Sequence, residues 1–324
     1  MPLFYGDAIL GKRYVAVDIG ATNVRVASGD GEGLTEKVVE RTDRENGPKG
    51  VSAQIIRLVR SLEVEELAAI GVGSIGPIDI GTGSIVNTPN FPFKEIPVLV
   101  PLTFEFHVPV RMLNDCAVAV LGEKEYGAGK GLWNLVYVTL STGLGGGAIV
   151  DGHVLIGKDG NAVEVGHLTI DPDSPLVCGC GCRGHWEAYS SGRNIPKYAR
   201  LLLSEIKAKG SLLQELAGGD PGGITAEILF EAARRLDPTA LTIVRKIGAV
   251  NAIGFADIVN VFDPQLITVG GSIALENPDL ILKPILENID RHLINRRPDI
   301  MITPLGEDAV LYGALALAMG DEIL

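Results

Sequence analysis

The chain has 324 residues, 46% hydrophobic and 21% charged, a composition typical of a globular protein large enough for two domains. Its formal net charge of −12 disfavours nucleic acid and anionic membranes as partners, since both repel an acidic surface. The N-terminus lacks the pattern of a signal peptide, and no apolar run approaches the roughly 18–20 residues of a membrane span. We therefore expect a cytoplasmic protein.

Hydrophobic periodicity and turn residues predict strands that alternate with helices in the first part of the chain. The expected strands are Tyr14–Asp18, Val24–Ser28, Ala68–Gly73 and Val110–Leu113. A helix is expected at Val51–Leu62, a loop from Ser74 to Pro101, and a second helix that begins near Cys116.

The rest of the chain is predicted to be richer in helices. The expected strands are Leu135–Leu140, Gly147–Val150, Leu266–Val269 and Ile300–Thr303. The expected helices are Trp186–Lys209, Thr225–Leu236, Thr239–Ile258, Pro278–Leu293 and Asp308–Met319. The Gly-rich segment Lys209–Gly223 is predicted to be a surface connection. Alternating strands and helices indicate an α/β protein.

Two glycine turns follow apolar strands in a repeated strand–turn–strand plan, at Val15–Val26 and Tyr137–Ile149. In the first, Gly20 lets the backbone approach a phosphate, the Thr22 hydroxyl can donate to it, and Asp18 can hold a hydrated Mg²⁺. An ordinary hairpin turn explains the same residues equally well.

The second turn is Ser141–Gly147, with four glycines among its last five residues. A bare backbone between two apolar strands favours a phosphate cradle over a flexible loop. A third turn, Gly270-Gly271-Ser272, follows the strand Leu266–Val269 and is a weak signal alone.

Asn114-Asp115 stands at the end of a predicted strand, where α/β proteins bind ligands. Asp115 can accept the proton of an attacking hydroxyl, as an Asp does in kinases. Spacing alone favours the alternative that Asp115 is a helix N-cap.

The cysteines are Cys116, Cys178, Cys180 and Cys182, of which three fall within five residues. Together with His167 and His185, such spacing predicts a tetrahedral Zn²⁺ site. Inert thiols in a glycine-rich turn, or a disulfide, are the alternatives.

These motifs, in this order, resemble the ROK family of sugar kinases and repressors over nearly the whole chain. The matching segments are Asp18–Arg25, Gly76-Pro77, Asn87–Asn90, Asn114-Asp115, Ser141–Gly147, Glu164-x-Gly166-His167, Cys178–Glu187 and Gly270-Gly271. The Cys178–Glu187 block joined to Glu164–His167 is the most specific part. The three glutamines of the chain are few, which is typical of a thermophile.

The resemblance implies a two-lobed actin-like, hexokinase-like fold of the ribonuclease H-like ATPase class, with a cleft between two α/β lobes. We expect residues 1–113 and 308–324 to form the small lobe, and residues 114–307 the large one. The last helix would fold back onto the N-terminal lobe.

The resemblance also implies roles for particular residues. Asp115 would be the catalytic base acting on the sugar's 6-hydroxyl, and Asn90, Asn114, Glu164, His167 and Glu187 would join it in binding the sugar. The nucleotide-binding positions would be Asp18, Gly20, Thr22, Asn23, Thr142, Gly143, Gly270 and Gly271. The zinc ligands would be His167, Cys178, Cys180 and a fourth residue.

The sequence departs from the family pattern at the zinc site and at one turn. His185 stands where the family usually has a cysteine, and Cys182 is additional, so either can be the fourth ligand. Ser272 stands where glycine is common.

The expected activity is transfer of the terminal phosphate of ATP to the 6-hydroxyl of glucose, with Mg²⁺ and a structural Zn²⁺. A kinase for fructose, mannose or an N-acetylhexosamine is the main alternative. A sugar-responsive repressor is disfavoured because the phosphate motif begins at Asp18, and a non-catalytic protein because Asp115 is retained. We expect a monomer or homodimer, with sugar and ATP as its partners.

Overall fold

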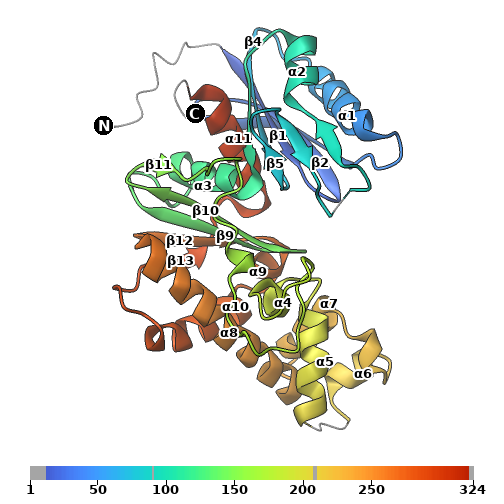
Figure 1. The fold of residues 1–324 in the computed structure, drawn as a ribbon, viewed down its shortest axis with the longest axis vertical. Helices are drawn as coiled ribbons and strands as arrows, with labels where there is room; N and C mark the ends of the chain where they lie inside the picture. Colours follow the sequence, from blue (N-terminus) through green and yellow to red (C-terminus); the bar gives the residue numbers. More distant parts are fainter. Residues whose placement is uncertain (1–11, 90, 207–209, 321–324) are drawn as a thin grey trace. The chain divides into compact units, whose positions relative to one another are not determined.

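The computed structural model describes residues 12–89, 91–206 and 210–320, in which strands and helices alternate as expected for an α/β protein (Figure 1). The chain forms two compact units. The first contains the described residues up to Tyr137, Gly147–Val163 and the C-terminal segment from Thr303; the second contains Val138–Gly146 and Glu164–Ile302. The lobe boundaries expected from the sequence remain a prediction.

The first unit is built on a five-stranded sheet with the order β3-β2-β1-β4-β8. Its strands are β1 Arg13–Ile19, β2 Asn23–Asp30, β3 Gly33–Arg41, β4 Leu67–Ser74 and β8 Val110–Asn114. Strands β1, β2 and β3 pair antiparallel, whereas β4 pairs parallel with β1 and β8. The small sheet β5-β6-β7 has the strands Ile78–Asp79, Ser84–Val86 and Glu95–Pro97.

Among the residues that the structure describes, four helices complete the first unit: α1 Pro48–Ser61, α2 Leu99–Phe106, α3 Asp115–Glu125 and α11 Ala309–Met319. Val15, Val17 and Ile19 alternate along β1 and share a core with Val51 and Ile55 of α1. The alternate residues on one face of β1 therefore pack in the same core as the apolar residues at helical spacing on α1.

Helix α11 packs on β1, β4 and α3 (Figure 1). A Cβ on Gly313 would lie 1.7 Å from the Val118 carbonyl oxygen, and one on Gly71 would lie 1.9 Å from that of Ala314. Backbones approach so closely here that only glycine fits. The fold-back of the last helix onto N-terminal strands is thus confirmed.

Strands β9 Leu135–Leu140 and β10 Leu144–Val150 contribute residues to both units. They belong to a five-stranded sheet with the order β11-β10-β9-β12-β13. The other strands of this sheet are β11 His153–Val154, β12 Leu266–Gly270 and β13 Asp299–Ile302.

The helices of the second unit follow β11 in chain order. They are α4 Glu187–Ser190, α5 Ile195–Ile206, α6 Leu212–Leu216, α7 Ala226–Arg234, α8 Pro238–Phe262, α9 Ser272–Glu276 and α10 Pro278–Asn288. Short 3-10 turns lie at η1 Val165–His167, η2 Pro221–Gly223, η3 Ile289–Arg291 and η4 Gly306–Asp308, the last in the first unit.

Four sequence predictions of elements are wrong in detail. The expected loop Ser74–Pro101 contains β5, β6, β7 and the start of α2, because strands of two or three residues leave no periodicity to detect. The expected single helix from Trp186 is two helices, interrupted at residues 191–194, and its expected end at Lys209 lies outside the described residues.

The segment Lys209–Gly223 is more than a connection, because it contains α6, started by a capping box of Ser211 and Gln214. The expected turn Ser141–Gly147 is shorter, since Gly145, Gly146 and Gly147 belong to strand β10.

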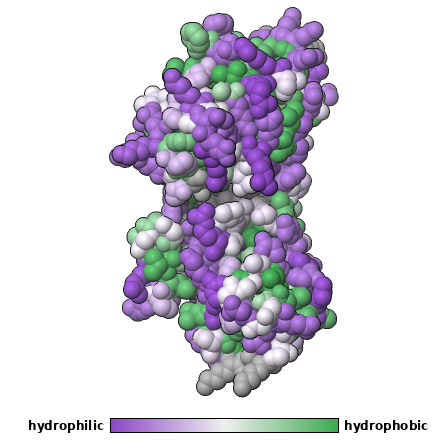
Figure 2. All heavy atoms as spheres, turned by 90° about the vertical axis from the view of Figure 1, so that its right-hand side faces the viewer, coloured by the Kyte–Doolittle hydropathy of each residue, from purple (hydrophilic) through white to green (hydrophobic). Residues whose placement is uncertain are grey.

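The surface is mostly polar. Figure 2 shows hydrophilic residues over most of the face that it presents, with hydrophobic ones in small groups. Large exposed hydrophobic residues occur singly or in pairs, as with Val100 and Phe104 on α2 and Ile294. Within the described ranges, no helix combines the length and apolar character that crossing a bilayer requires.

Candidate active site and metal centre

The turn between β1 and β2 is fixed by backbone hydrogen bonds and exposes Thr22. The N–H of Gly20 donates to the Asn23 carbonyl at 2.9 Å, and the Thr42 hydroxyl donates to the Gly20 carbonyl at 2.8 Å. Thr42 N–H also donates to the Thr22 carbonyl at 2.9 Å. These hydrogen bonds fix the backbone of the turn, while Thr22 stays exposed to solvent.

Asp18 lies at the end of β1, directly opposite Arg25 in the antiparallel pair. Burial raises the pKa of Asp18 to about 7, with further upward effects from Asp115 and Asp308. Arg25 opposes this shift, since its Nε lies 3.6 Å from the Asp18 carboxylate. A cation near Asp18 would favour its ionised form in the same way.

Arg25 is itself held by the segment before α11. Its guanidinium donates to the Glu307 carbonyl and lies 4.0 Å from Asp308. Lys37 binds both carboxylate oxygens of Asp308 at 2.8 Å. Charges of alternating sign thus run from Lys37 to Asp18 within the first unit.

Asn114 and Asp115 lie at the junction of β8 and α3, the first as the helix cap and the second as the first residue of the helix. Asn114 is the N-cap of α3, and its Oδ1 accepts the Cys116 N–H at 2.9 Å. Asp115 is the first helical residue, so the alternative that Asp115 is the cap is wrong. Its Oδ1 also accepts from the Cys116 N–H, at 2.7 Å, and burial raises its pKa above the ordinary value.

The second glycine turn, in the second unit, spans Ser141–Gly143 between β9 and β10. The Ser141 N–H donates to the Gly143 carbonyl at 3.0 Å. The third glycine turn, Gly270–Ser272 at the end of β12, lies beside it, since the Ser141 and Ser272 hydroxyl oxygens are 3.4 Å apart. Gly271 has a φ of 84°, and a Cβ there would lie 2.4 Å from the Leu140 carbonyl oxygen.

The predicted repeat of strand, turn and strand is present in the structure. Residues 21–30 and residues 141–150 show the same succession of exposed, half-buried and buried positions. Thr22 and Thr142 are the exposed members of their segments. At least one glycine of the second segment is required by packing and not by a phosphate. A Cβ on Gly147 would lie 2.0 Å from the Cys116 carbonyl oxygen.

Glu164, His167 and Glu187 come together in the second unit around the start of β10. The 3-10 turn η1 packs on Leu144 through Gly166, where a Cβ would lie 2.1 Å from the Leu144 carbonyl oxygen. Glu187 begins α4, and its Oε2 accepts the Leu144 N–H at 3.2 Å. His167 Nε2 lies 3.9 Å from Glu164 Oε2. Asn90, the remaining predicted sugar residue, lies outside the described residues.

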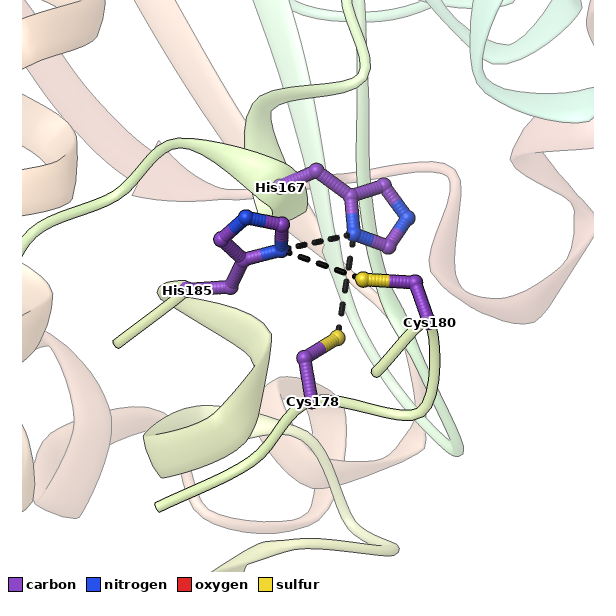
Figure 3. A group of neighbouring side chains, drawn as sticks. All are labelled: His167, Cys178, Cys180 and His185. Carbon is purple, nitrogen blue, oxygen red and sulfur yellow. Dashed lines mark hydrogen bonds between the residues drawn. The ribbon is translucent and has the colours of Figure 1, made fainter. Parts of the chain in front are cut away.

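Four of the predicted metal ligands converge on one point (Figure 3). The ligand atoms of His167, Cys178, Cys180 and His185 all lie within 4.8 Å of one another. His167 Nδ1 lies 3.3 Å from His185 Nδ1 and 3.7 Å from Cys178 Sγ, and Cys180 Sγ lies 3.3 Å from His185 Nδ1. A tetrahedral zinc ion with ordinary bond lengths has ligand–ligand edges of about 3.3–3.8 Å, a range that these three distances match.

Cys182 is outside this group. Its side chain is exposed, while its carbonyl accepts the Cys178 N–H at 2.9 Å and so shapes the turn that presents Cys178 and Cys180. All four cysteines are free thiols in the structure. Burial raises the pKa of Cys178 to about 12, and burial together with His167 lowers the pKa of His185.

One element of the site was not anticipated from the sequence. Trp186, between His185 and Glu187, is fully buried, and its Nε1 donates to Asn251 Oδ1 at 2.8 Å. Gly254 of α8 admits the indole, since a Cβ there would lie 2.3 Å from the ring. Trp186 thereby anchors its two neighbours to α8. The sequence feature that could have indicated this contact is Gly254, a glycine inside the apolar helix α8. Its role becomes clear only when the indole of Trp186 is known to lie against it.

Comparison with known proteins agrees with these features. The ROK family model matches residues 14–321. The chain is 40% identical over 306 residues to a glucokinase of Pyrobaculum calidifontis, covering 94% of this chain and 95% of that protein. It is 26% identical to the xylose repressor of Bacillus subtilis, of which the match covers 76%.

The fold is similar to a solved ROK family glucokinase of Streptomyces griseus in complex with glucose and AMPPNP. The TM-score is 0.79 at 31% identity, over 94% of this chain and 99% of that one. The actin-like, hexokinase-like fold expected from the motifs is thus confirmed. On its motifs, its fold and its family match, the chain belongs to the ROK family.

Proposed function

We propose that this protein is an ATP-dependent kinase that phosphorylates the 6-hydroxyl of glucose. The observation that carries the proposal is its 40% identity, over 94% of the chain, to a protein named glucokinase. A relative of similar fold binds glucose together with AMPPNP, an ATP analogue. This chain carries candidate groups for each part of the reaction, namely a carboxylate base, phosphate turns and a set of polar side chains that can bind sugar hydroxyls.

The base in this proposal is Asp115. Its carboxylate takes the proton of the 6-hydroxyl while that oxygen bonds to the γ-phosphorus of ATP and the bond to the leaving ADP breaks. The Cys116 N–H at 2.7 Å fixes one carboxylate oxygen. A partly buried carboxylate with a raised pKa is a stronger base than an exposed one.

On the sugar side, the proposal assigns hydrogen bonds with glucose to Asn90, Asn114, Glu164, His167 and Glu187. Asn114 uses Oδ1 for the helix cap, which leaves its Nδ2 group to donate. His167 directs Nδ1 toward the metal group and Nε2 toward Glu164, so one imidazole can serve both a metal and a sugar.

For the nucleotide, we assign Gly20, Thr22, Asn23, Thr142 and Gly143 to the phosphates and Gly270 and Gly271 to the adenosine. Mg²⁺ held at Asp18 would neutralise charge on the ATP oxygens. A Zn²⁺ ion on His167, Cys178, Cys180 and His185 would be structural, because four protein ligands leave no open position. It would tie η1 to the turn before α4 and so fix His167 beside Glu187.

Kinases for fructose, mannose or an N-acetylhexosamine use the same catalytic groups and stay the alternative. The lower identity to the xylose repressor, 26% against 40%, favours the kinase. The cytoplasm is the compartment, and a monomer or homodimer the assembly, that fit this proposal.

A coupled ADP-release assay over glucose, mannose, fructose, glucosamine and N-acetylated hexosamines tests the proposal. We expect the highest kcat/KM with glucose. If no sugar released ADP above the rate with water alone, the kinase assignment would be wrong. A higher kcat/KM with another sugar would keep the kinase and change its substrate.

A further inference from the structure

Residues 191–194 separate α4 from α5 and lie against the glycine turn of the second unit. The Gly192 N–H donates to the Ser141 carbonyl at 2.7 Å, and the Arg193 N–H donates to the Thr142 carbonyl at 3.4 Å. A Cβ on Gly192 would lie 3.0 Å from the Ser141 carbonyl oxygen. The backbone of this loop is therefore pressed directly onto a turn that we assign to the phosphates.

The loop is held in one conformation from within. Ser191 and Asn194 are almost completely buried, and Asn194 Nδ2 donates to the Ser191 hydroxyl at 2.9 Å. Lys197 on α5 donates to Asn194 Oδ1 at 2.9 Å. Ser191 is extended, with a ψ of 151°, which is what ends α4. Gly192 and Arg193 lie between the two members of this buried polar pair, which fixes the backbone on both sides of them.

Of these two residues, Arg193 is exposed. Its side chain, unlike its backbone N–H, makes no hydrogen bond or ion pair with any residue in the described part of the chain. Some arginines of the same unit are paired, as Arg235 is with Glu231 at 2.7 Å and Arg297 with Asp290 at 3.0 Å. Others in the described chain, such as Arg200 and Arg296, make no such pair but do not adjoin a glycine turn. In a protein with a net charge of −12, an arginine whose backbone contacts a proposed phosphate turn and whose side chain is unpaired in the described chain is a candidate site for an anion.

We infer that the loop 191–194 forms a third wall of the nucleotide site, beside the turns at 141–143 and 270–272, and that Arg193 binds a phosphate of ATP or ADP. The inference rests on the proposed function, in that it assumes a nucleotide at these turns. The chemistry follows from the guanidinium, which offers several N–H donors in a plane that matches two phosphate oxygens.

The same segment connects the two substrates of the proposed reaction. Glu187, a proposed sugar ligand, begins α4, and Arg193 follows the end of this one-turn helix. Because the chain between them is short and anchored at both ends, the sugar and phosphate contacts are set by a single rigid piece of the second unit.

The test compares Arg193→Met, which keeps an unbranched stem without charge, with Arg193→Lys and wild type. We expect Arg193→Met to raise the KM for MgATP and weaken ADP binding about tenfold, with the KM for glucose unchanged. Arg193→Lys should recover part of the loss. Arg245→Met on α8 is the matched control. Arg245 is also exposed, and within the described chain its side chain donates a hydrogen bond only to the Thr242 hydroxyl.

Calorimetric titration with ADP and with adenosine separates the outcomes. A phosphate contact predicts weaker ADP binding and unchanged adenosine binding in Arg193→Met. Equal losses for both ligands, or no loss for either, would overturn the inference. The ADP titration needs no turnover, so a protein that bound ADP through Arg193 but phosphorylated no sugar would contradict the proposed function alone.

Discussion

The Nδ1 atoms of His167 and His185 lie 3.3 Å apart and face the same point, together with the thiols of Cys178 and Cys180. Two imidazole nitrogens at this distance, with two sulfur atoms beside them, match the edges of a metal tetrahedron. The two histidines come from segments 18 residues apart, so an ion shared by them would cross-link η1 to the chain before α4.

We predict that the purified protein contains one zinc ion per chain, measured by elemental analysis. Cys178→Ser and Cys180→Ser should lose most of it and unfold at lower temperature, because a structural zinc ion contributes directly to folding. Cys182→Ser is the matched control and should retain the metal, since its thiol is exposed and outside the group. Loss of zinc in Cys182→Ser and not in His185→Ala would make Cys182 the fourth ligand.

Asp115→Asn should reduce kcat by a factor of about 10²–10⁴, the usual contribution of a general base, because an amide cannot accept the proton of the sugar hydroxyl. Its Oδ1 can still accept the Cys116 N–H, so the melting temperature should change little. The measurement is ADP release at saturating substrates, with circular dichroism as the folding control. Turnover near that of wild type would remove Asp115 from the role of base.

Asp18→Asn should stabilise the metal-free protein increasingly as the pH rises. The folded-state pKa of Asp18, about 7, exceeds the value near 4 of an unfolded chain, because burial penalises the carboxylate. The stability that its protonated form gives is present below about pH 4 and is lost as the pH rises through 7. Asparagine avoids this loss.

Melting temperatures of both proteins at pH 4.5, 6 and 8 measure the effect. We expect the variant to gain a few degrees at pH 8 and little at pH 4.5. A difference that does not depend on pH would show that Asp18 is not buried as a protonated acid. The same variant should bind MgATP more weakly, if Asp18 holds the metal.

Gly313→Ala should lower the free energy of unfolding by about 2 kcal/mol or more, because the added Cβ would overlap the Val118 carbonyl and force α11 away from α3. Gly31→Ala is the control, since nothing lies within 4 Å of its Cβ position and its φ is not positive. It should change stability by less than about 0.5 kcal/mol. Equal effects in chemical denaturation would contradict the packing described for α11.

The sequence predicted features that depend on residues close together in the chain, namely periodic strands and helices and clustered candidate ligands. Most of the long strands and helices were predicted within a few residues, because their apolar residues face one core, as with β1 and α1. The nine-residue strand β3 was not predicted, because most of its residues are exposed or half-buried and polar. The Cys/His group was predicted as a set of residues, because Cys and His at such spacings are the usual ligands of a structural metal site. The sequence could not choose between His185 and Cys182, because both side chains can bind zinc and both lie at suitable spacing. The structure places His185 in the group of candidate ligands and Cys182 outside it.

Other features depend on partners that are distant in sequence. Gly147 reads as part of a phosphate turn, although its small size is required by the Cys116 carbonyl 31 residues earlier. The role of Trp186 depends on Asn251 and Gly254 in α8. At Asn114-Asp115 the asparagine is the helix cap and the aspartate is the first helical residue, which depends on backbone angles that the residue types do not specify.

The packing of α11 also has a consequence for the order of events during synthesis. The chain passes between the two units four times, and α11 is made only after the whole second unit. Strands β1 and β4 emerge early, yet the face that α11 covers stays open until the last helix leaves the ribosome. This face of the N-terminal sheet is therefore buried only after nearly the entire chain has been made, whereas all residues of the second unit precede α11.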